Sequence, residues 1–307
     1  MKKFVVKRLF LSLLTIFCII TVTFFLMHAI PGDPFKKEGK TPPVVYENLR
    51  AKYGLDKPKI TQYGIYLSKV VRFDFGDSMK SKTETVNQMI KRGFPVSMRL
   101  GLQALVVALV FGVILGVFAA LYQNKFPDYL SMIIALIGIS VPSFIMGQFL
   151  IQFVARNTAL PISGFDSFAH TILPSVSLAL MPLAQIARLM RSSMLEVLNQ
   201  DYIKTARSKG IRKSTIIIGH AVKNAILPVV SILGTMISNL LAGSFVIEKI
   251  FGIPGLGKFF VDSIIQRDYT LIMGTTIFYS IILISMLLIV DIMYVFVDPR
   301  IKVAKEA

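Results

Sequence analysis

Charged residues and cysteine are both scarce in this chain. Asp, Glu, Lys and Arg make up only 17% of its 307 residues, whereas about a quarter of the residues in a soluble domain are charged. The single cysteine, Cys18, excludes a disulfide scaffold. The sequence shows no cluster of metal-ligating residues, and Cys18 lies inside an apolar run, where we expect it to serve packing alone.

Apolar residues take the place of the missing charge. They account for 54% of the chain, and the mean hydropathy is +0.67. A chain this apolar does not stay unfolded, so disorder is excluded together with a collagen-like repeat. Acidic residues number 17 against 34 Lys and Arg, which gives a net charge of +17. In a soluble protein this charge would indicate a nucleic-acid partner, but here the positions of the basic residues decide its meaning.

Long uncharged runs predict an all-α polytopic membrane protein with six transmembrane helices. A helix needs about 20 apolar residues to cross the hydrocarbon core of a bilayer. Five runs without Asp, Glu, Lys or Arg reach that length: Leu9–Ile30, Leu100–Tyr122, Tyr129–Ala155, Ala225–Ile247 and Tyr269–Val290. A sixth, Thr171–Ala187, is shorter and contains Pro174 and Pro182, which makes it the weakest of the set.

The basic residues predict the orientation, because Lys and Arg concentrate in cytoplasmic loops. With the N-terminus inside, the cytoplasmic segments hold sixteen Lys and Arg, and the two short outer loops hold four. We therefore expect both termini in the cytoplasm. Basic residues also precede the first run, but its apolar stretch is long and no small-residue cleavage site follows it. We expect an uncleaved span there, not a signal peptide.

These runs divide the chain into four parts. We expect an N-terminal tail and first span over residues 1–30, an extracytoplasmic helical segment over 31–99, a transmembrane domain over 100–297 and a cytoplasmic tail over 298–307. Within the transmembrane domain, spans are expected near 100–122, 129–155, 171–190, 225–247 and 269–297, with a cytoplasmic loop near 191–224.

The outer segment carries the start and stop signals of three short helices. Pro42-Pro43 is placed to open a helix through Tyr53, with Gly54 just after its end, and Pro58 is placed to open a second helix. Ser81 and Glu84 have the spacing of a capping box for a third helix. We expect that helix to end near Gly93-Phe94-Pro95.

Two motifs resemble catalytic sequences but lack parts that the chemistry needs. The stretch 252–258 has the spacing of a phosphate-binding loop, yet Phe259 stands where Mg²⁺ requires Ser or Thr. We expect an outer turn there, followed by a re-entrant or interfacial helix. Ser140 lies within the third run, but no histidine is expected at its depth to act as a base, so Ser140-Val141-Pro142 is interpreted as a proline kink. The chain is expected to have no catalytic site and to hydrolyse no ATP itself.

Polar side chains inside the apolar runs are candidates for lining a pore. An amide that faces lipid without a partner is unfavourable, so these residues should face the bundle interior or a wet cavity. They are Gln103, Gln148, Gln152, Gln185 and Asn239. Contact with substrate and pairing with one another are equally good interpretations. Gly112-x-x-x-Gly116 indicates close helix packing, and Asp291 is interpreted as a paired structural carboxylate, not a proton-relay residue.

The longest cytoplasmic segment, Arg188–Asn224, predicts two short helices joined at a glycine. Residues 201–209 form the first, with Gly210 just after its end, and Ser214 is placed to cap a second helix over Thr215–Ile226. Because both helices continue into spans, a soluble partner that pushed on them would tilt those spans. A basic patch that binds anionic lipid is an equally good interpretation from these residues alone.

The sequence resembles the permease subunits of ABC importers, specifically those of the oligopeptide, dipeptide and nickel group. The cytoplasmic coupling loop of that family is similar to Tyr202-Ile203-x-Thr205-Ala206-Arg207-x-Lys209-Gly210 followed by Asn224-Ala225-x-Leu227-Pro228. Further matches are Pro31-Gly32-Asp33-Pro34, Tyr53-Gly54-Leu55-Asp56-x-Pro58, Phe73-x-Phe75-Gly76-x-Ser78, Glu248-x-x-Phe251-x-Ile253-Pro254-Gly255-Leu256-Gly257, Arg267-Asp268-Tyr269 and Asp298-Pro299-Arg300-Ile301. Their order and spacing around six spans make the resemblance specific, although the Glu-Ala-Ala of the family's loop is not literal here.

The resemblance implies a division of labour. This chain would form half of a translocation pore in a bacterial inner membrane, beside a second homologous permease subunit. An extracytoplasmic solute-binding protein would deliver peptides to the outer face. Two cytoplasmic ABC ATPases would bind ATP and Mg²⁺ and hold the coupling loops. The chain itself would then bind membrane lipid, but no cofactor, metal or nucleic acid.

The residues expected to carry these roles fall into three groups. The ATPase-coupling residues are Asp201, Tyr202, Thr205, Ala206, Arg207, Lys209 and Gly210. The pore-lining candidates are Gln103, Gln148, Gln152 and Asn239. The candidates for contact with the binding protein on the outer face are Ile253, Pro254, Gly255 and Asp268.

Two other functions stay open. A permease of the same family for nickel or another small solute would have the same architecture, because in this family the binding protein supplies most of the specificity. A stand-alone secondary transporter is the less favoured alternative. No inverted repeat is evident in the sequence, and only Asp291 resembles an intramembrane coupling carboxylate.

Overall fold

The computed structural model describes residues 2–30, 34–35, 42–81 and 83–297. Within these ranges the regular elements are helices, with one isolated antiparallel bridge between Asp77 and Thr85, so the expected all-α class is confirmed. The motif residues 31–33 and 298–301 and the expected tail 298–307 lie outside the described residues. The chain divides into two compact units, Met1–Pro95 with Gly255–Leu288, and Val96–Pro254 with Ile289–Ala307.

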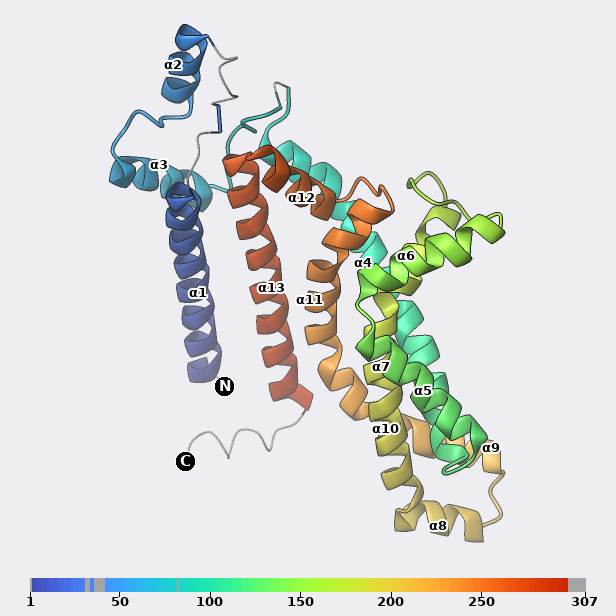
Figure 1. The fold of residues 1–307 in the computed structure, drawn as a ribbon. Helices are drawn as coiled ribbons and strands as arrows, with labels where there is room; N and C mark the ends of the chain where they lie inside the picture. Colours follow the sequence, from blue (N-terminus) through green and yellow to red (C-terminus); the bar gives the residue numbers. More distant parts are fainter. Residues whose placement is uncertain (1, 31–33, 36–41, 82, 298–307) are drawn as a thin grey trace. The chain divides into compact units, whose positions relative to one another are not determined.

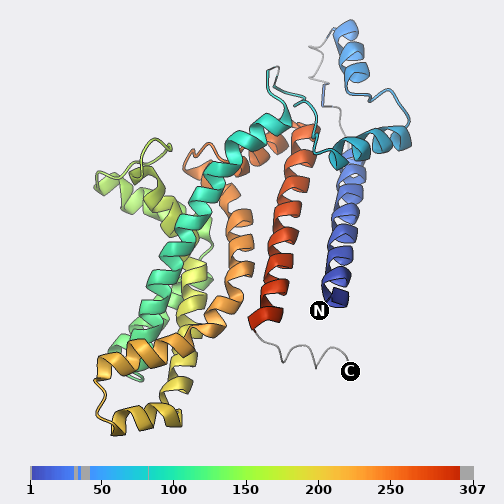
Figure 2. The same cartoon turned by 180° about the vertical axis from the view of Figure 1, so that it is seen from behind.

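The first unit consists of two long helices and a cap of shorter helices. Its elements are α1 (Lys2–Ala29), α2 (Pro43–Lys52), α3 (Lys59–Val71), the beginning of α4 (Val86–Leu121), α12 (Leu256–Gln266) and most of α13 (Tyr269–Val297). α1 and α13 run in opposite directions, with the first residues of α1 at the same end of the unit as the last turns of α13 (Figures 1 and 2). Phe24 and Met27 of α1 form a buried cluster with Tyr269 and Met273 of α13.

Proline and glycine set the ends of the cap helices as predicted. Pro43 stands in the first turn of α2, and Pro58 occupies the N-cap of α3. After the C-cap residue Tyr53, Gly54 has a φ of +67°, a left-handed conformation that favours glycine.

The third outer helix differs from the prediction at both ends. The side chain of Ser81 accepts the N–H of Glu84 at 3.1 Å, but the capping box that opens α4 is formed by Thr85 and Gln88. Thr85 Oγ1 accepts the N–H of Gln88 at 3.2 Å, and Gln88 Oε1 accepts the N–H of Thr85 at 2.9 Å. α4 then continues through Pro95 to Leu121, so the predicted end near Pro95 is wrong. Proline removes one helical hydrogen bond, and packing along the rest of a 36-residue helix offsets that loss.

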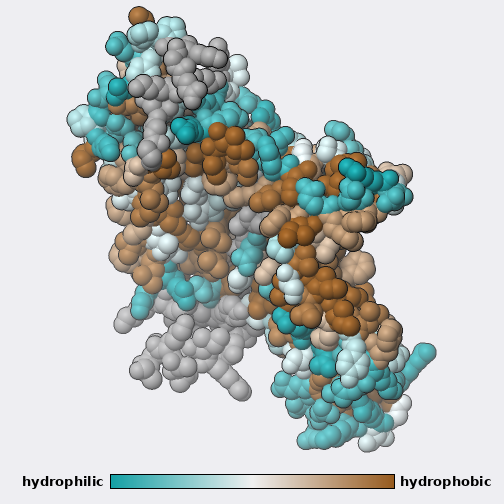
Figure 3. Space-filling model, in the orientation of Figure 1, coloured by the Kyte–Doolittle hydropathy of each residue, from teal (hydrophilic) through white to brown (hydrophobic). Residues whose placement is uncertain are grey.

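The second unit contains the remaining helices. They are the rest of α4, α5 (Phe126–Ser140), α6 (Ser143–Phe153), η1 (Ala155–Asn157), α7 (Ala169–Leu198), α8 (Asp201–Ser208), α9 (Lys213–Thr215), the π-helix η2 (Ile216–Val222), α10 (Lys223–Ala225) and α11 (Leu227–Ile250). Figure 3 shows a hydrophilic surface at the end of this unit that carries α8 and α9, and a largely hydrophobic surface along the adjoining helices.

α7 is the central helix of the second unit, in contact with α5, α6, α10 and α11. Glycines let its neighbours approach closely: a Cβ on Gly116 of α4 would lie 2.6 Å from the carbonyl oxygen of Ala187, and one on Gly138 of α5 would lie 2.7 Å from that of Leu180. The packing role predicted for Gly112-x-x-x-Gly116 is therefore confirmed. Among α1, α4, α7 and α13, α7 has the lowest hydropathy, and 56% of its most apolar window is buried by the rest of the protein.

Four helices are long and apolar enough to cross a membrane singly, namely α1, α4, α7 and α13. Two bent pairs raise the count of described spans to six if each pair is one span: Phe126–Ser140 with Ser143–Asn157, bent by 110°, and Lys213–Ala225 with Leu227–Ile237, bent by 50°. The expected kink near Ser140 is thus a complete break. Val141 precedes Pro142 and is held extended, with a ψ of 119°, because proline disfavours the helical region for the residue before it.

Candidate functional site

The helix expected to couple to an ATPase is present as α8, which follows α7 after two residues. One side of α8 is anchored, since Ile203 and Ala206 are buried and belong to the same apolar cluster as Met190 and Met194 of α7. The other predicted coupling residues, Asp201, Tyr202, Thr205, Arg207, Lys209 and Gly210, are all exposed. α8 therefore presents a polar face while its apolar face fixes it to the helix that it would move.

The end of α8 needs glycine at position 210 because of the backbone conformation there, not because a Cβ would clash. Gly210 follows the C-cap residue Lys209, has a φ of +74° and donates its N–H to the carbonyl of Arg207 at 3.0 Å. A Cβ at this position would meet nothing within 4 Å. The predicted place of Gly210 after the helix is confirmed, and any other residue there would be strained by its backbone.

A hydrogen bond ties α8 to the chain that returns to the next span. Asn224 Nδ2 donates to the hydroxyl of Tyr202 at 3.1 Å and to the carbonyl of His220 at 2.8 Å. The returning chain begins its helix at Lys213, so the predicted cap at Ser214 is wrong, since that residue already lies inside the first turn. Seven residues of this helix are π-helical, a form that occurs frequently at functional sites and that the apolar pattern does not reveal.

The structure separates the pore candidates into two kinds. Gln103 is half-buried on α4, and its Oε1 accepts a hydrogen bond from Ser175 of α7 at 3.4 Å. Gln148 and Gln152 are exposed on successive turns of α6, and Asn239 is exposed on α11. Pairing within the bundle therefore accounts for Gln103, whereas the three exposed amides are polar groups on otherwise apolar helices. Their role as pore-lining residues stays a prediction.

The outer-face candidates are partly buried. Ile253 is 0% exposed, and its N–H donates to the carbonyl of Glu248 at 2.9 Å, while the next residue, Pro254, is exposed. Gly255 is buried at the N-cap of α12. The expected short helix after this turn is present as α12. Contact between these residues and a binding protein stays a prediction, with Pro254 the one among them whose side chain is exposed.

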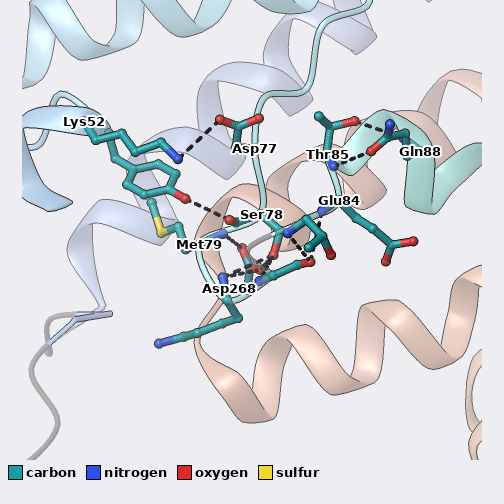
Figure 4. A network of polar contacts seen from close by, with 12 residues as sticks. Lys52, Asp77, Ser78, Met79, Glu84, Thr85, Gln88 and Asp268 are labelled. Carbon is teal, nitrogen blue, oxygen red and sulfur yellow. Dashed lines mark hydrogen bonds and ion pairs between the residues drawn. The ribbon is translucent and has the colours of Figure 1, made fainter.

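Asp268 is also buried, at 2% exposure, and its carboxylate organises the loop 78–80 beside the start of α13 (Figure 4). It accepts the hydroxyl of Ser78, the N–H of Met79 at 3.1 Å and the N–H of Lys80 at 3.3 Å. It also accepts the N–H of Leu271 at 3.0 Å, which makes it the cap of α13. These contacts engage the carboxylate within the chain, so we expect Asp268 to position the outer loop rather than to touch a partner directly.

A tyrosine extends this network to α2. The hydroxyl of Tyr53 donates to the carbonyl of Ser78 at 2.8 Å. Burial raises the pKa of the Tyr53 hydroxyl, and the carboxylates of Asp77 and Asp268 raise it further. The hydroxyl therefore stays protonated, as a donor must. Among the described residues, no group of three or more His, Cys, Asp or Glu is placed to hold a metal ion.

The second unit contains an ion pair that the sequence patterns do not indicate, with a buried carboxylate and a half-buried guanidinium. Arg191 of α7 and Asp128 of α5 contact each other through two hydrogen bonds, of 2.6 and 2.7 Å. From the sequence alone, Arg191 is one of several basic residues in the segment Arg188–Asn224, and nothing distinguishes it from the others. A signal for the pair is Asp128, an acid directly before the apolar run Tyr129–Ala155.

Two family models together match nearly the whole chain. The model described as "Binding-protein-dependent transport system inner membrane component" matches residues 112–303. The model of the corresponding N-terminal region of such membrane components matches residues 1–101.

Curated relatives match over their full length. The chain is 52% identical over 307 residues to the dipeptide transport system permease protein DppB of Bacillus subtilis (strain 168), covering 100% of both chains. It is 43% identical over 303 residues to DppB of Lactococcus lactis subsp. cremoris (strain MG1363), covering 98% of this chain and 100% of that one. It is 43% identical over 305 residues to the oligopeptide transport system permease protein OppB of Haemophilus influenzae, with the same coverage.

A solved structure supports the fold. The chain resembles one titled "Crystal structure of an amino acid ABC transporter with histidines", with a TM-score of 0.52 and 14% sequence identity over 67% of this chain and 92% of that one. At this identity the likeness concerns the fold alone.

Proposed function

Because this chain belongs to the family of inner membrane components of binding-protein-dependent transport systems, we propose that it is a permease subunit of an ABC importer for peptides. The observation that carries the proposal is identity of 52% to a dipeptide permease over the entire length of both chains. The alignment covers 100% of both chains, which supports the same architecture for the two proteins. The exposed polar face of α8 and the anchored apolar face behind it suit such a subunit, since an ATPase needs a rigid element to push.

In the proposed assembly, this chain supplies half of the pore and the coupling element. Two ATPase subunits bind ATP and Mg²⁺, hydrolyse the ATP and displace α8 through its exposed residues. A second homologous permease completes the pore. The chain thus contributes a membrane element with two conformations, and the nucleotide state of its partners biases the balance between them.

The proposed path of the substrate runs past the exposed amides. Gln148 and Gln152 on α6 and Asn239 on α11 would be unfavourable against lipid, so we place them toward the aqueous path or the second permease. Amide side chains both donate and accept hydrogen bonds. They therefore suit the main chain of peptides whose side chains vary.

The proposed orientation puts both termini in the cytoplasm of the bacterial cell. The antiparallel packing of α1 and α13 within the first unit brings the beginning of α1 and the late turns of α13 to one side (Figures 1 and 2). The excess of Lys and Arg in the loops between spans supports the cytoplasmic assignment for that side. The cap formed by α2, α3 and α12 would then face the extracytoplasmic binding protein.

Transport by a deletion strain tests the proposal directly. We expect loss of this chain to abolish uptake of a radiolabelled dipeptide and tripeptide, and the full chain supplied in trans to restore both. The variant Ala206→Glu places a charge on the buried face of α8 and should insert in the membrane without restoring uptake, whereas Ala206→Ser should restore it. Loss of nickel uptake with normal peptide uptake would contradict the peptide assignment. Peptide uptake by this chain alone in proteoliposomes, driven by a proton gradient, would contradict the ABC assignment.

A further inference from the structure

An ion pair that the proposed function has not used joins α5 to α7, with a buried carboxylate and a guanidinium side chain that is 26% exposed. Arg191 Nε lies 2.6 Å from Asp128 Oδ1, and Arg191 Nη2 lies 2.7 Å from Asp128 Oδ2. Asp128 is 2% exposed, and Oδ2 also accepts the N–H of Asn124 at 2.9 Å. Because two parallel hydrogen bonds join a planar guanidinium to a planar carboxylate, the pair fixes the mutual orientation of the two helices as well as their distance.

The basic partner lies on the helix that leads to α8. α7 continues without interruption from Arg191 to Leu198, and α8 begins at Asp201. Ile203 of α8 is buried in the same apolar cluster as Met190 and Met194 of α7. A displacement of α8 therefore reaches Arg191 through continuous helix and packed side chains.

The acidic partner lies where α5 begins. Asp128 stands in the first turn of α5, and Asn124 belongs to the short turn that joins α4 to α5. Figure 1 shows the start of α5 at the end of the second unit that carries α8. α4 packs against α7 at the same level, since a Cβ on Gly116 would lie 2.6 Å from Met190 Cβ and 3.1 Å from the nitrogen of Arg191. The ion pair thus holds the α4–α5 turn and the first turn of α5 to α7.

Beyond the ion pair, α5 leads to the exposed amides. It ends at Ser140, and the helix is interrupted at Val141-Pro142. α6 follows at an angle of 110°, with Gln148 and Gln152 exposed on it. Dispersion contacts between α5 and α7 have no direction of their own, whereas hydrogen bonds do. The bidentate pair near one end of the contact therefore adds a directional restraint against sliding and rotation of α5 relative to α7.

We propose that Asp128 and Arg191 are positioning residues that make α5 follow α7 when an ATPase displaces α8. Motion of the coupling helix is thereby transmitted through α5 to the break at Val141-Pro142 and to α6. This inference rests on the proposed function, because it needs a partner that moves α8. The inference predicts that loss of the ion pair lowers coupling between ATP hydrolysis and transport. If the pair only stabilised the fold, its loss would instead lower the amount of assembled complex.

The test uses the complete complex in proteoliposomes: this chain, the second permease, both ATPases and the binding protein. Dipeptide uptake and ATP hydrolysis are measured in the same vesicles. We expect Asp128→Asn and Arg191→Gln to lower the peptide taken up per ATP hydrolysed by about 2- to 30-fold while hydrolysis continues. The double variant should show the same ratio as either single variant, since either change already removes the pair. Arg188→Gln is the matched control, an exposed arginine one turn earlier on α7, and should leave the ratio unchanged.

A conservative variant keeps the test decisive if the neutral variants fail to assemble. Arg191→Lys retains the charge and loses the bidentate geometry, so the complex should assemble and the ratio should fall. An unchanged ratio in Arg191→Lys, or in assembled Asp128→Asn, would overturn the inference. So would defects in the two single variants that add in the double variant. Failure of the unaltered complex to take up peptide would count against the proposed function instead.

Discussion

The hydroxyl of Ser78 donates a hydrogen bond to the carboxylate of Asp268, which lies 190 positions further along the chain. The same carboxylate caps α13 through the N–H of Leu271. One buried side chain therefore fixes the loop around Ser78 to the first turn of α13. The cap of the first unit is held by polar contacts that converge on a single acid, and this convergence can be tested by removing its charge.

We expect Asp268→Asn to lower the free energy of unfolding by about 1–3 kcal/mol. An amide offers one acceptor oxygen where the carboxylate offers two, so at least one of the four converging N–H and O–H donors loses its partner. Thermal unfolding of the purified chain in detergent, followed by circular dichroism, measures the change. Asp77→Asn is the matched control, an acid one residue before Ser78 whose side chain is 55% exposed, and it should change stability by no more than about 0.5 kcal/mol. Equal losses in the two variants would contradict the organising role of Asp268.

The elements predicted best from the sequence are those whose ends are set locally. Pro43, Gly54, Pro58 and Gly210 each act through the backbone conformation of their own position, so the bounds of α2, the start of α3 and the end of α8 follow from residue type. The long apolar runs likewise indicate helices, because a span must satisfy its backbone hydrogen bonds internally.

The elements predicted worst depend on distant packing. Pro95 is a local signal to end a helix, yet α4 continues through it, because contacts along the rest of the helix outweigh one lost hydrogen bond. α7 has a weak apolar signal because protein surrounds it, and hydropathy cannot distinguish a span that protein covers from a poor span. Asp268 is separated by 190 positions from Ser78, and Asp128 by 63 from Arg191. A single sequence contains no local pattern for such pairs.

The close approach of α4 to α7 predicts that Gly116 does not tolerate a side chain. We expect Gly116→Ala to lower the free energy of unfolding by about 1–3 kcal/mol, because its Cβ would lie 2.6 Å from the carbonyl oxygen of Ala187, a backbone atom that cannot rotate away. Gly64→Ala on α3 is the matched control, since a Cβ there meets nothing within 4 Å. That variant should be neutral or more stable by about 0.5–1 kcal/mol. Thermal unfolding of both variants in the same detergent measures these changes. A Gly116→Ala variant as stable as the unaltered chain would show that α4 can move away from α7.

The left-handed conformation of Gly210 predicts a graded response to substitution. Gly210→Asn should retain most binding of the ATPase partner, since asparagine adopts this conformation more readily than other residues. Gly210→Val should lose it, because a β-branched side chain is strained there by at least about 1–2 kcal/mol and the end of α8 would unwind. The Cβ that both variants add meets nothing within 4 Å, so a clash at that atom does not distinguish them. Co-purification of the ATPase with each variant measures the effect, and equal binding by the two would show that the φ of +74° is not needed.

Exposure of three amides on apolar helices predicts where water enters the assembled complex. In a chain whose single cysteine is replaced by Cys18→Ser, we expect Gln148→Cys, Gln152→Cys and Asn239→Cys to react with a charged, membrane-impermeant maleimide. The reactive species is the thiolate, which forms in water and not in hydrocarbon. Phe149→Cys is the matched control, because Phe149 adjoins Gln148 on α6 and is 51% exposed in the isolated chain, so accessibility alone does not separate the two positions.

The informative quantity is the ratio of the maleimide reaction rates at positions 148 and 149, which are neighbours on α6. Adjacent residues on a helix point about 100° apart, so a helix between water and lipid would place Gln148 and Phe149 in different environments. We expect the cysteine at 148 to react about tenfold or more faster than the cysteine at 149, and bound peptide to slow the reaction at 148 and not at 149. Equal rates would mean that α6 lies wholly in water or wholly in lipid. Faster reaction at 149 would place the amides against protein and remove Gln148 and Gln152 from the proposed path, leaving Asn239 on α11 as its remaining candidate.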